Sequence, residues 1–354
     1  MQDQDLSEAL REQVLAALAG GAPLSIVGGG SKTFYGRKQR GEALNVSAHS
    51  GIVGYEPTEL VLSARAGTPL TVIEAALAEQ GQMLAFEPPH FGPSATLGGT
   101  VACGLSGPRR PYAGSVRDFV LGIKLLNGKG EILSFGGKVM KNVAGFDLSR
   151  LMVGSLGTLG VILEVSLKVL PRPESEATLV FEMTAERALA TVSRWSAQSW
   201  PLSAASHDGR HLYLRLSGAE AAVRASGQRL GGDPMPEGEG FWEELREHRL
   251  AFFAGGRNLW RFSLAPATPH PNLPGDWFTD WGGALRWLSS DAPAADVFEA
   301  ARAAGGHATM FRSAAPGGQV FQPLPDRLKQ LHLDLKRAFD PAGIFNPGRM
   351  YEEW

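Results

Sequence analysis

The sequence predicts an α+β protein with two lobes, and three observations lead to this class. Strands, glycine-rich turns and helices alternate in the first part of the chain, as they do in α/β and α+β proteins. The segment Pro171-Arg172-Pro173-Glu174-Ser175 then interrupts the pattern and marks a domain boundary. Beyond it, short strands and Ala-rich helices are separated by Pro/Gly loops, which indicates a small antiparallel sheet with helices on one face.

The first lobe is predicted from apolar spacing and turn residues. Leucines and Val14 recur at helical spacing over residues 6–18, and Gly20-Gly21 ends this helix. A strand over 24–27 runs directly into glycines, and a second strand covers 60–65. Thr68 is a good N-cap and Pro69 suits the first position of the next helix, which stops at Gly81.

The remaining elements are predicted in the same way. Residues 91–107 show no regular period and are expected to form a loop rich in glycine, serine and threonine. Asp147 is expected to cap a short helix that runs to Met152. The other expected elements are a hairpin of strands 119–126 and 131–135, strands 161–170, 212–216, 259–264 and 309–312, and helices 185–198 and 294–304.

Composition excludes several classes of protein. The chain has 354 residues and a formal net charge of -2, so it has no basic excess to hold a nucleic acid backbone. Cys103 is its single cysteine, which excludes an internal disulfide, a cysteine zinc site and an iron–sulfur cluster held by this chain alone. The polar N-terminus and the lack of a long apolar run predict a cytoplasmic chain.

Glycine is abundant, with 44 residues, and it occurs in clusters. The first cluster, Gly28-Gly29-Gly30-Ser31-Lys32-Thr33, follows a strand, where successive backbone amides can form a nest for a phosphate. It is not a Walker A loop, and it lacks the third glycine of a Rossmann fingerprint because Thr33 stands there. Taken alone, it is equally compatible with a flexible turn.

Two further clusters favour a large dinucleotide over a single phosphate. Small and hydroxyl-bearing residues fill 92–107 and again 154–161. Such residues bury little apolar area, so a hydrophobic core gains little from them. A long cofactor threaded along the backbone would use all three clusters.

Longer stretches carry a resemblance to a known family. The segments PSATLGGTVACGLSGPRRPYAGSVRDFVLGIKLLNGKGEI, KNVAGFDLSRLMVGSLGTLGVI and FDPAGIFNPGR resemble the FAD-binding family of vanillyl-alcohol oxidase and p-cresol methylhydroxylase (PCMH), especially its branch that oxidises D-lactate and glycolate. The segments SHDGRHLYLRLSG, LWRFSLAP and GGHATMFRS are similar to the small FAD-binding subunits of bacterial glycolate oxidases.

The resemblance implies an architecture and partners. We expect a two-lobed PCMH-type FAD-binding domain over residues 1–172 and a smaller ferredoxin-like antiparallel sheet over 173–325. Residues 326–354 would return to the FAD domain. The implied partners are a larger FAD-containing glycolate oxidase subunit and an iron–sulfur subunit, through which the chain would reach the membrane indirectly.

The resemblance also implies the residues that hold FAD. Residues 28–33 would carry the pyrophosphate, and Asn346 would approach the flavin ring from the C-terminal return. Family members with covalent flavin use a His or Cys near these loops, whereas here no His lies between Gly28 and Thr33 and Cys103 replaces a frequent asparagine, so we expect non-covalent FAD. The full expected set is Gly28, Gly29, Gly30, Ser31, Lys32, Thr33, Pro93, Ser94, Gly98, Gly99, Thr100, Cys103, Ser106, Gly107, Gly160, Val161 and Asn346.

Oxidation of a small 2-hydroxy acid needs a hydride acceptor, a base for the hydroxyl proton and a cation for the carboxylate. Arg261 and Arg312 are the candidate cations and His307 is the candidate base. Each has a structural alternative, because the arginines can be outward strand positions and His307 can simply end a helix. His207 and His211 flank a predicted turn at Asp208-Gly209 and are expected to be exposed.

The sequence shows no paired histidines with a carboxylate that would suit a metal, so no metal site is predicted. Three functions therefore stay open. The chain is predicted to act as the FAD-binding subunit of a glycolate oxidase that forms glyoxylate. The alternatives are a non-catalytic FAD-binding scaffold or electron relay, and a single-chain FAD-dependent oxidase of another alcohol.

Overall fold

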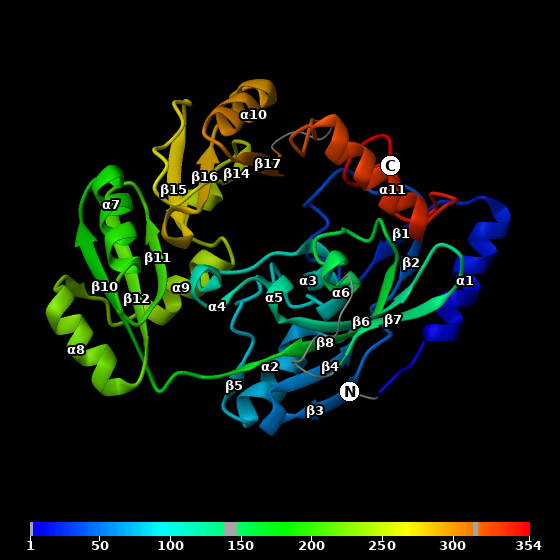
Figure 1. Ribbon diagram of the computed structural model, residues 1–354, viewed down its shortest axis with the longest axis horizontal. Coiled ribbons are helices and arrows are strands. Elements are labelled where there is room, and N and C mark those ends of the chain that lie inside the picture. Colours follow the sequence, from blue (N-terminus) through cyan, green and yellow to red (C-terminus); the bar gives the residue numbers. More distant parts are fainter. Residues whose placement is uncertain (1–2, 138–146, 314–317) are drawn as a thin grey trace.

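The computed structural model describes residues 3–137, 147–313 and 318–354. The first six residues of the segment KNVAGFDLSRLMVGSLGTLGVI lie outside these ranges. The chain forms two lobes that lie side by side, and its last helix returns to the first lobe (Figure 1). The change from one lobe to the other falls between β9 (Leu170–Pro171) and β10 (Ser175–Glu182).

The first lobe is built on a five-stranded antiparallel sheet with the order β3-β4-β8-β6-β7. A parallel pair, β1 and β2, lies beside it and receives the C-terminal return through a bridge from Leu24 to Phe345. The strands are β1 Leu24–Val27, β2 Glu42–Asn45, β3 Ile52–Glu56, β4 Val61–Arg65, β5 Gln82–Met83, β6 Val120–Leu126, β7 Ile132–Gly136 and β8 Val161–Lys168. The helices are α1 Ser7–Gly20, η1 Pro57–Glu59, α2 Leu70–Glu79, α3 Leu97–Cys103, α4 Arg110–Ala113, α5 Val116–Phe119, α6 Leu148–Leu151 and α11 Asp326–Phe339.

The second lobe is an eight-stranded antiparallel sheet with the order β13-β10-β12-β11-β15-β16-β14-β17. Strands β10 to β13 form one half of the sheet and strands β14 to β17 form the other. Counted inward from its outer edge, each half has the strand order 4-1-3-2, which is the expected ferredoxin-like arrangement. The strands after β10 are β11 Leu202–His207, β12 His211–Gly218, β13 Asp233–Pro234, β14 Leu259–Ser263, β15 Asp276–Asp280, β16 Leu285–Ser289 and β17 His307–Arg312. The helices are α7 Ala185–Ser196, α8 Glu220–Leu230, α9 Gly238–Arg246, η2 Ala251–Ala254, η3 Trp281–Gly283 and α10 Ala294–Ala303.

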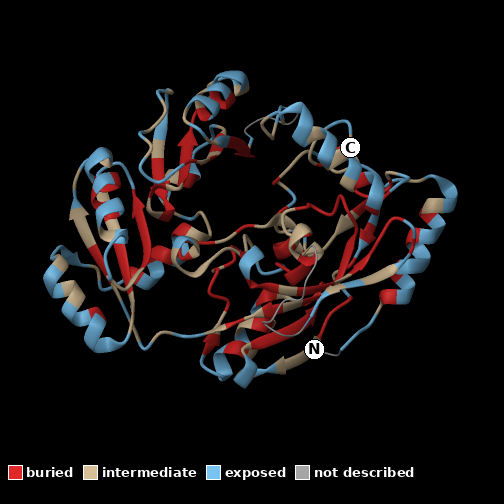
Figure 2. Cartoon of the chain, in the orientation of Figure 1, coloured by how far each residue is buried: buried red, intermediate tan, exposed pale blue. Residues whose placement is uncertain are grey.

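The two faces of this large sheet have different neighbours, because alternate residues of a strand point to opposite sides. Helices α7, α8 and α10 pack on the outer face, on apolar residues such as Leu214 and Trp260. The inner face carries Tyr213 and Trp287, and it is covered by α9, η2 and the first lobe. Figure 2 shows buried residues along these strands and exposed residues on the outer helices. The sequence predicted helices on one face of this sheet. Helices α7, α8 and α10 do share one face, but α9 lies on the opposite face.

Two local expectations are wrong. Residues 97–103, expected to be part of a loop, form α3, whose first turn is capped when Thr96 Oγ1 accepts from the amide of Gly99. Thr68 does not cap α2. Its hydroxyl instead accepts from the amide of Gly51 and donates to the carbonyl of the same residue, and Pro69 holds the cap position.

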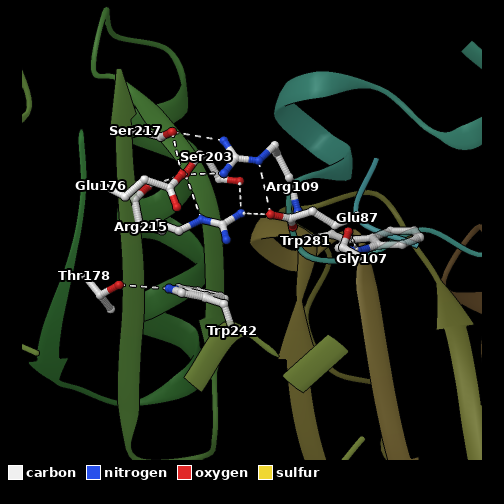
Figure 3. Close-up of polar contacts among 10 residues, drawn as sticks. All are labelled: Glu87, Gly107, Arg109, Glu176, Thr178, Ser203, Arg215, Ser217, Trp242 and Trp281. Atoms are coloured by element: carbon white, nitrogen blue, oxygen red, sulfur yellow. Dashed lines mark hydrogen bonds and ion pairs between the residues drawn. The ribbon is translucent and has the colours of Figure 1, made fainter. Parts of the chain in front are cut away.

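The lobes are joined by a buried network of charges (Figure 3). The carboxylate of Glu87, in the first lobe, accepts from the Nε and amide of Arg109 at 3.2 and 2.8 Å, and from Nη2 of Arg215 at 2.8 Å. Arg215 lies on β12 of the second lobe. Arg109 also reaches across, to the carboxylate of Glu176 and to Ser217 Oγ. The side chains of Arg109 and Arg215 are only 8% and 6% exposed, so neither charge can turn to water if a partner is lost.

We predict that Arg215→Met lowers the free energy of unfolding by about 3–5 kcal/mol, because it leaves buried acceptors without their donor. Arg224→Met is the matched control, since its pair with Glu220 is 65% exposed on both sides, and it should cost less than about 0.5 kcal/mol. Urea unfolding of the two variants measures both values. Equal unfolding midpoints for the two variants would contradict the stabilising role assigned to the buried charge network between the lobes.

Candidate functional site

A groove in the first lobe gathers the three glycine clusters. The residues predicted to hold the cofactor that line it are Gly28, Gly29, Gly30, Ser31, Lys32, Thr33, Gly98, Gly99, Cys103, Gly160 and Asn346. These residues come from the loop after β1, from α3, from the position directly before β8 and from the C-terminal return. Segments that are far apart in sequence therefore form one site, as the cluster argument expected.

The glycines are required because the clusters pack in direct contact. A Cβ on Gly29 would lie 1.4 Å from the carbonyl oxygen of Ser94, and one on Gly28 would lie 2.7 Å from Thr96 Oγ1. Gly157, at a φ of +71°, would bring a Cβ to 2.7 Å from Asn346 Nδ2. No side chain fits at these points, so the groove wall is bare backbone.

The loop after β1 has free donors. Within the described residues, the amides of Gly29, Gly30, Ser31 and Lys32 donate to no protein acceptor. Successive unpaired amides of this kind form a nest that suits a diphosphate. Lys32 adds a buried cation, whose Nζ donates to Ser31 Oγ at 3.4 Å and to the carbonyl of His90 at 3.2 Å, and burial lowers its pKa. The bare wall, the unpaired amides and the cation together fit an extended dinucleotide.

Asn346 lines the groove, but its side chain is engaged with the protein. Its Oδ1 accepts from the amide of Ile26 and its Nδ2 donates to the carbonyl of Leu156, both at 2.7 Å. Asn346 thereby ties the C-terminal return to the first and third clusters, at a φ of +41° that asparagine tolerates better than most residues. Its predicted contact with a flavin ring stays a prediction.

Arg349 is a residue of the groove that sequence reasoning missed. Its buried guanidinium donates to the carbonyls of Thr33, Tyr35 and Arg37, which fixes the chain directly after the first cluster. Arg349 could have been predicted to line the groove, because it is the last residue of the segment FDPAGIFNPGR that carries part of the family resemblance.

Six residues of the predicted cofactor set lie outside the groove lining. Pro93 and Ser94 are exposed beside it, and Ser94 Oγ donates to the carbonyl of Gly29 at 2.6 Å. Thr100 and Val161 are fully buried behind the wall. Ser106 and Gly107 line a different, interlobe cavity.

The interlobe cavity lies between the loop that follows α3 and the inner face of the large sheet. Of the predicted catalytic residues, Arg261 lines this cavity, while Arg312 and His307 do not. The guanidinium of Arg312 lies over the ring of Phe34, 5.1 Å from its centroid, and His307 is exposed at the start of β17. His207, expected to be exposed, is buried and contacts the carbonyl of Met183 through Nε2 at 2.9 Å.

Two titratable residues of this cavity were absent from the sequence prediction. Asp280 is fully buried, and burial raises its pKa to about 7 although its carboxylate accepts from the amide of Trp281. His248 is half-buried with its Nδ1 enclosed, and burial followed by the charges of Arg312 and Arg261 lowers its pKa well below the ordinary value. No sequence pattern marked either residue. Asp280 ends β15 and His248 lies just after α9, and the cavity that brings them together forms only where this lobe meets the other one.

Metal and membrane features can be stated only for the described ranges. Across 3–137, 147–313 and 318–354, no three His, Cys, Asp or Glu side chains gather as they would around a metal ion. Nor does any helix within those ranges combine the length and the apolar character needed to cross a bilayer. Cys103 is partly exposed in the groove, and burial raises the pKa of its thiol.

Comparison with known proteins gives consistent matches. A family model described as an FAD binding domain matches residues 5–136. The chain is 52% identical over 353 residues to glycolate oxidase subunit GlcE of Escherichia coli (strain K12), covering 100% of this chain and 99% of that protein. A D-lactate dehydrogenase of Anaerostipes hadrus matches at 34% identity over 157 residues, 44% of this chain and 32% of that protein.

A second oxidase subunit and a solved structure extend the comparison. Glycolate oxidase subunit GlcD of Bacillus subtilis (strain 168) is 44% identical over 85 residues, which are 24% of this chain and 18% of that protein. A solved structure of alkyldihydroxyacetonephosphate synthase matches with a TM-score of 0.65 and 15% sequence identity. The match covers 96% of this chain and 75% of the synthase chain. At that identity the structural match shows a shared fold.

We predict that Asn346→Ala lowers the free energy of unfolding by about 2–4 kcal/mol. The change leaves the Ile26 amide and the Leu156 carbonyl without partners, at about 1–3 kcal/mol each. Asn45→Ala serves as the control, because Asn45 makes its hydrogen bond to Ser47 at the surface. Thermal and urea unfolding measure the difference, and similar losses in both variants would refute the role assigned to Asn346.

Proposed function

The chain belongs to the FAD-binding family that includes glycolate oxidase subunit GlcE, and on that premise we propose that it is the FAD-binding subunit of a glycolate oxidase complex. The proposed reaction converts glycolate, or a related 2-hydroxy acid, to the 2-oxo acid. The observation that carries this proposal is the 52% identity to GlcE over the full length of both chains, including the second lobe and the C-terminal return.

The groove supplies the means to hold FAD without a covalent bond. The amides of residues 29–32 and the buried Lys32 would carry the diphosphate, while the bare walls at Gly98, Gly99 and Gly160 allow close approach of the flavin. Bound FAD would accept the hydride of the hydroxy acid. The partly exposed Cys103 is the one thiol of the chain, and its raised pKa keeps it protonated and poorly nucleophilic.

Proposed partners follow from the same family. We infer that the chain assembles with a larger FAD-containing glycolate oxidase subunit and with an iron–sulfur subunit. The chain itself would be cytoplasmic and would reach the inner face of the membrane through those partners. Co-expression with affinity purification of the tagged chain tests this assembly, and recovery of the chain alone would contradict it.

FAD should raise the melting temperature of the purified chain, since a ligand at 100 times its Kd adds about 2.7 kcal/mol to the free energy of unfolding. Gly29→Val should abolish this increase, because its side chain would overlap Ser94. Gly20→Ala is the control, because a Cβ there meets nothing within 4 Å. An equal FAD-dependent increase in Gly29→Val would count against the groove as the flavin site.

The bound flavin should be released intact by acid, and Cys103→Ser should retain it. Visible absorbance of the supernatant after precipitation measures release. Flavin that stays with the precipitated wild-type protein but leaves Cys103→Ser would show a covalent bond and overturn the non-covalent assignment.

Catalysis by this chain is tested by adding glycolate anaerobically to the FAD-loaded protein without partners. Bleaching of the flavin absorbance is the expected result. A flavin that dithionite reduces but glycolate does not would favour the scaffold or electron-relay alternative. Bleaching by other alcohols alone would favour a single-chain oxidase of a different substrate.

A further inference from the structure

A second cavity of the first lobe shares a wall with the proposed flavin groove. Its volume is about 240 Å³, just below the roughly 300–1,000 Å³ that small-molecule sites span. Ser155 and Thr158 line it, whereas Leu156 and Gly157, which lie between them in the chain, line the groove. One loop therefore separates two distinct spaces, and the proposed oxidation makes no use of this one.

Most of the lining of this cavity is apolar. Helices α5, α6 and α11, labelled in Figure 1, and the end of the C-terminal return meet around it. The rings of His332 and Tyr351 hold Trp354 in place, with their centroids 5.0 and 4.6 Å from the centroid of its ring. The apolar side chains in the lining are Leu151, Val153, Leu159, Leu335, Met350 and Trp354. A ligand with an apolar body would thus replace water against these side chains.

The charged side chains among the described residues of the lining are Arg117, Arg150 and Lys336, and all three are cationic. Two of them already have anionic partners. Nζ of Lys336 donates to the carboxylate of Asp340 at 2.6 Å, and Nε of Arg150 lies 3.0 Å from the carboxylate of Asp147. Those two pairs leave one positive charge in the lining uncompensated.

Arg117 carries that charge. It is exposed on α5 and, within the part of the chain that the structure describes, its guanidinium makes no hydrogen bond and no ion pair. His332 adds no charge at neutral pH, because burial lowers its pKa. Glu353, which precedes Trp354, is engaged by Nζ of Lys329 at 2.6 Å. An anion is therefore the ligand that the charges around this cavity favour.

The indole of Trp354 provides a second, independent indication of a ligand. Its Nε1 is enclosed and has no hydrogen-bond partner among the described residues. Buried donors nearly always have an acceptor in native proteins. A carboxylate oxygen is a suitable acceptor, so the same kind of ligand would satisfy both the indole N–H and the charge of Arg117.

We propose that this cavity binds a small amphipathic carboxylate. Arg117 and the indole N–H of Trp354 bind the carboxylate, and the aliphatic chain of the ligand packs on the apolar lining. The site is additional to the proposed oxidation and does not require bound flavin. Glycolate and oxalate do not qualify as ligands, because they have no apolar body.

The class of ligand is tested with a series of straight-chain carboxylates on the FAD-loaded chain, in which FAD occupies the flavin groove. Isothermal titration calorimetry should show octanoate binding, with affinity rising about fourfold for each CH₂ group from butyrate to octanoate as the chain enters the cavity. Acetate should bind at least tenfold more weakly than octanoate. Equal affinities for acetate and octanoate would overturn the apolar part of the site.

The carboxylate contacts are tested with Arg117→Gln and with Trp354→Phe, which keeps an aromatic ring but removes the N–H. Each change should weaken octanoate binding about tenfold, the low end for a hydrogen bond to a charged group. Arg194→Gln is the matched control, because Arg194 is also exposed and without a partner among the described residues, but lies on α7 of the second lobe. Circular dichroism melting establishes that each variant is folded.

The outcomes separate this site from the flavin groove. Octanoate binding at wild-type affinity in Arg117→Gln would overturn the anion site, and so would a complete lack of binding to the wild-type chain. Octanoate that binds only the FAD-free chain would occupy the flavin groove, which would also overturn the proposal. Octanoate binding that depends on Arg117 in a chain that fails to bind FAD would support this site and count against the proposed function.

Discussion

Two carboxylates fix the loop between Glu87 and Phe91, and the relation between the lobes depends on them. Glu87 binds the buried Arg109 and Arg215 at one end. At the other end, Glu247 of the second lobe accepts from the amides of His90 and Phe91. Both ends of the loop have positive φ, +47° at Glu87 and +52° at Phe91, a conformation that costs residues with side chains about 1–3 kcal/mol each. The ionic contacts offset this strain and keep the inner sheet face against the first lobe.

The local elements were largely predictable because short-range rules fix them. The strand before the first glycine cluster, the hairpin of β6 and β7 and the Asp147 cap follow from alternation, turn residues and side-chain acceptors. Helix α3 was not predictable in this way, since it contains Gly98 and Gly99. Its formation depends on packing, because a Cβ on Gly98 would lie 2.6 Å from that of Ala66. Tertiary contact here outweighs a poor helix propensity of about 1 kcal/mol per glycine.

The groove was predictable and the interlobe cavity was not, for a physical reason. Tight backbone contact demands glycine, so the groove leaves a signature in composition. The cavity depends on the register of β14 against β16 and β17, which turns Arg261 inward, and on the left-handed backbone of His248 after α9. Such long-range pairings have no local signature. Of the three residues predicted to be catalytic, Arg261 lines the cavity, whereas His307 is exposed at the start of β17. The catalytic roles of all three remain predictions.

The large sheet is a tandem of two similar halves that meet where β11 pairs with β15, through His207 and Thr279. The half before this seam bears Glu176 and Arg215, which anchor the lobe, whereas the half after it bears Arg261, Asp280 and Trp287, which surround the cavity. Each half has its own apolar cluster beneath its own helices. Attachment of the lobe and the lining of the interlobe cavity are thus carried by separate halves of one sheet, so the residues around the cavity can change without loss of the ionic contacts that attach the lobe.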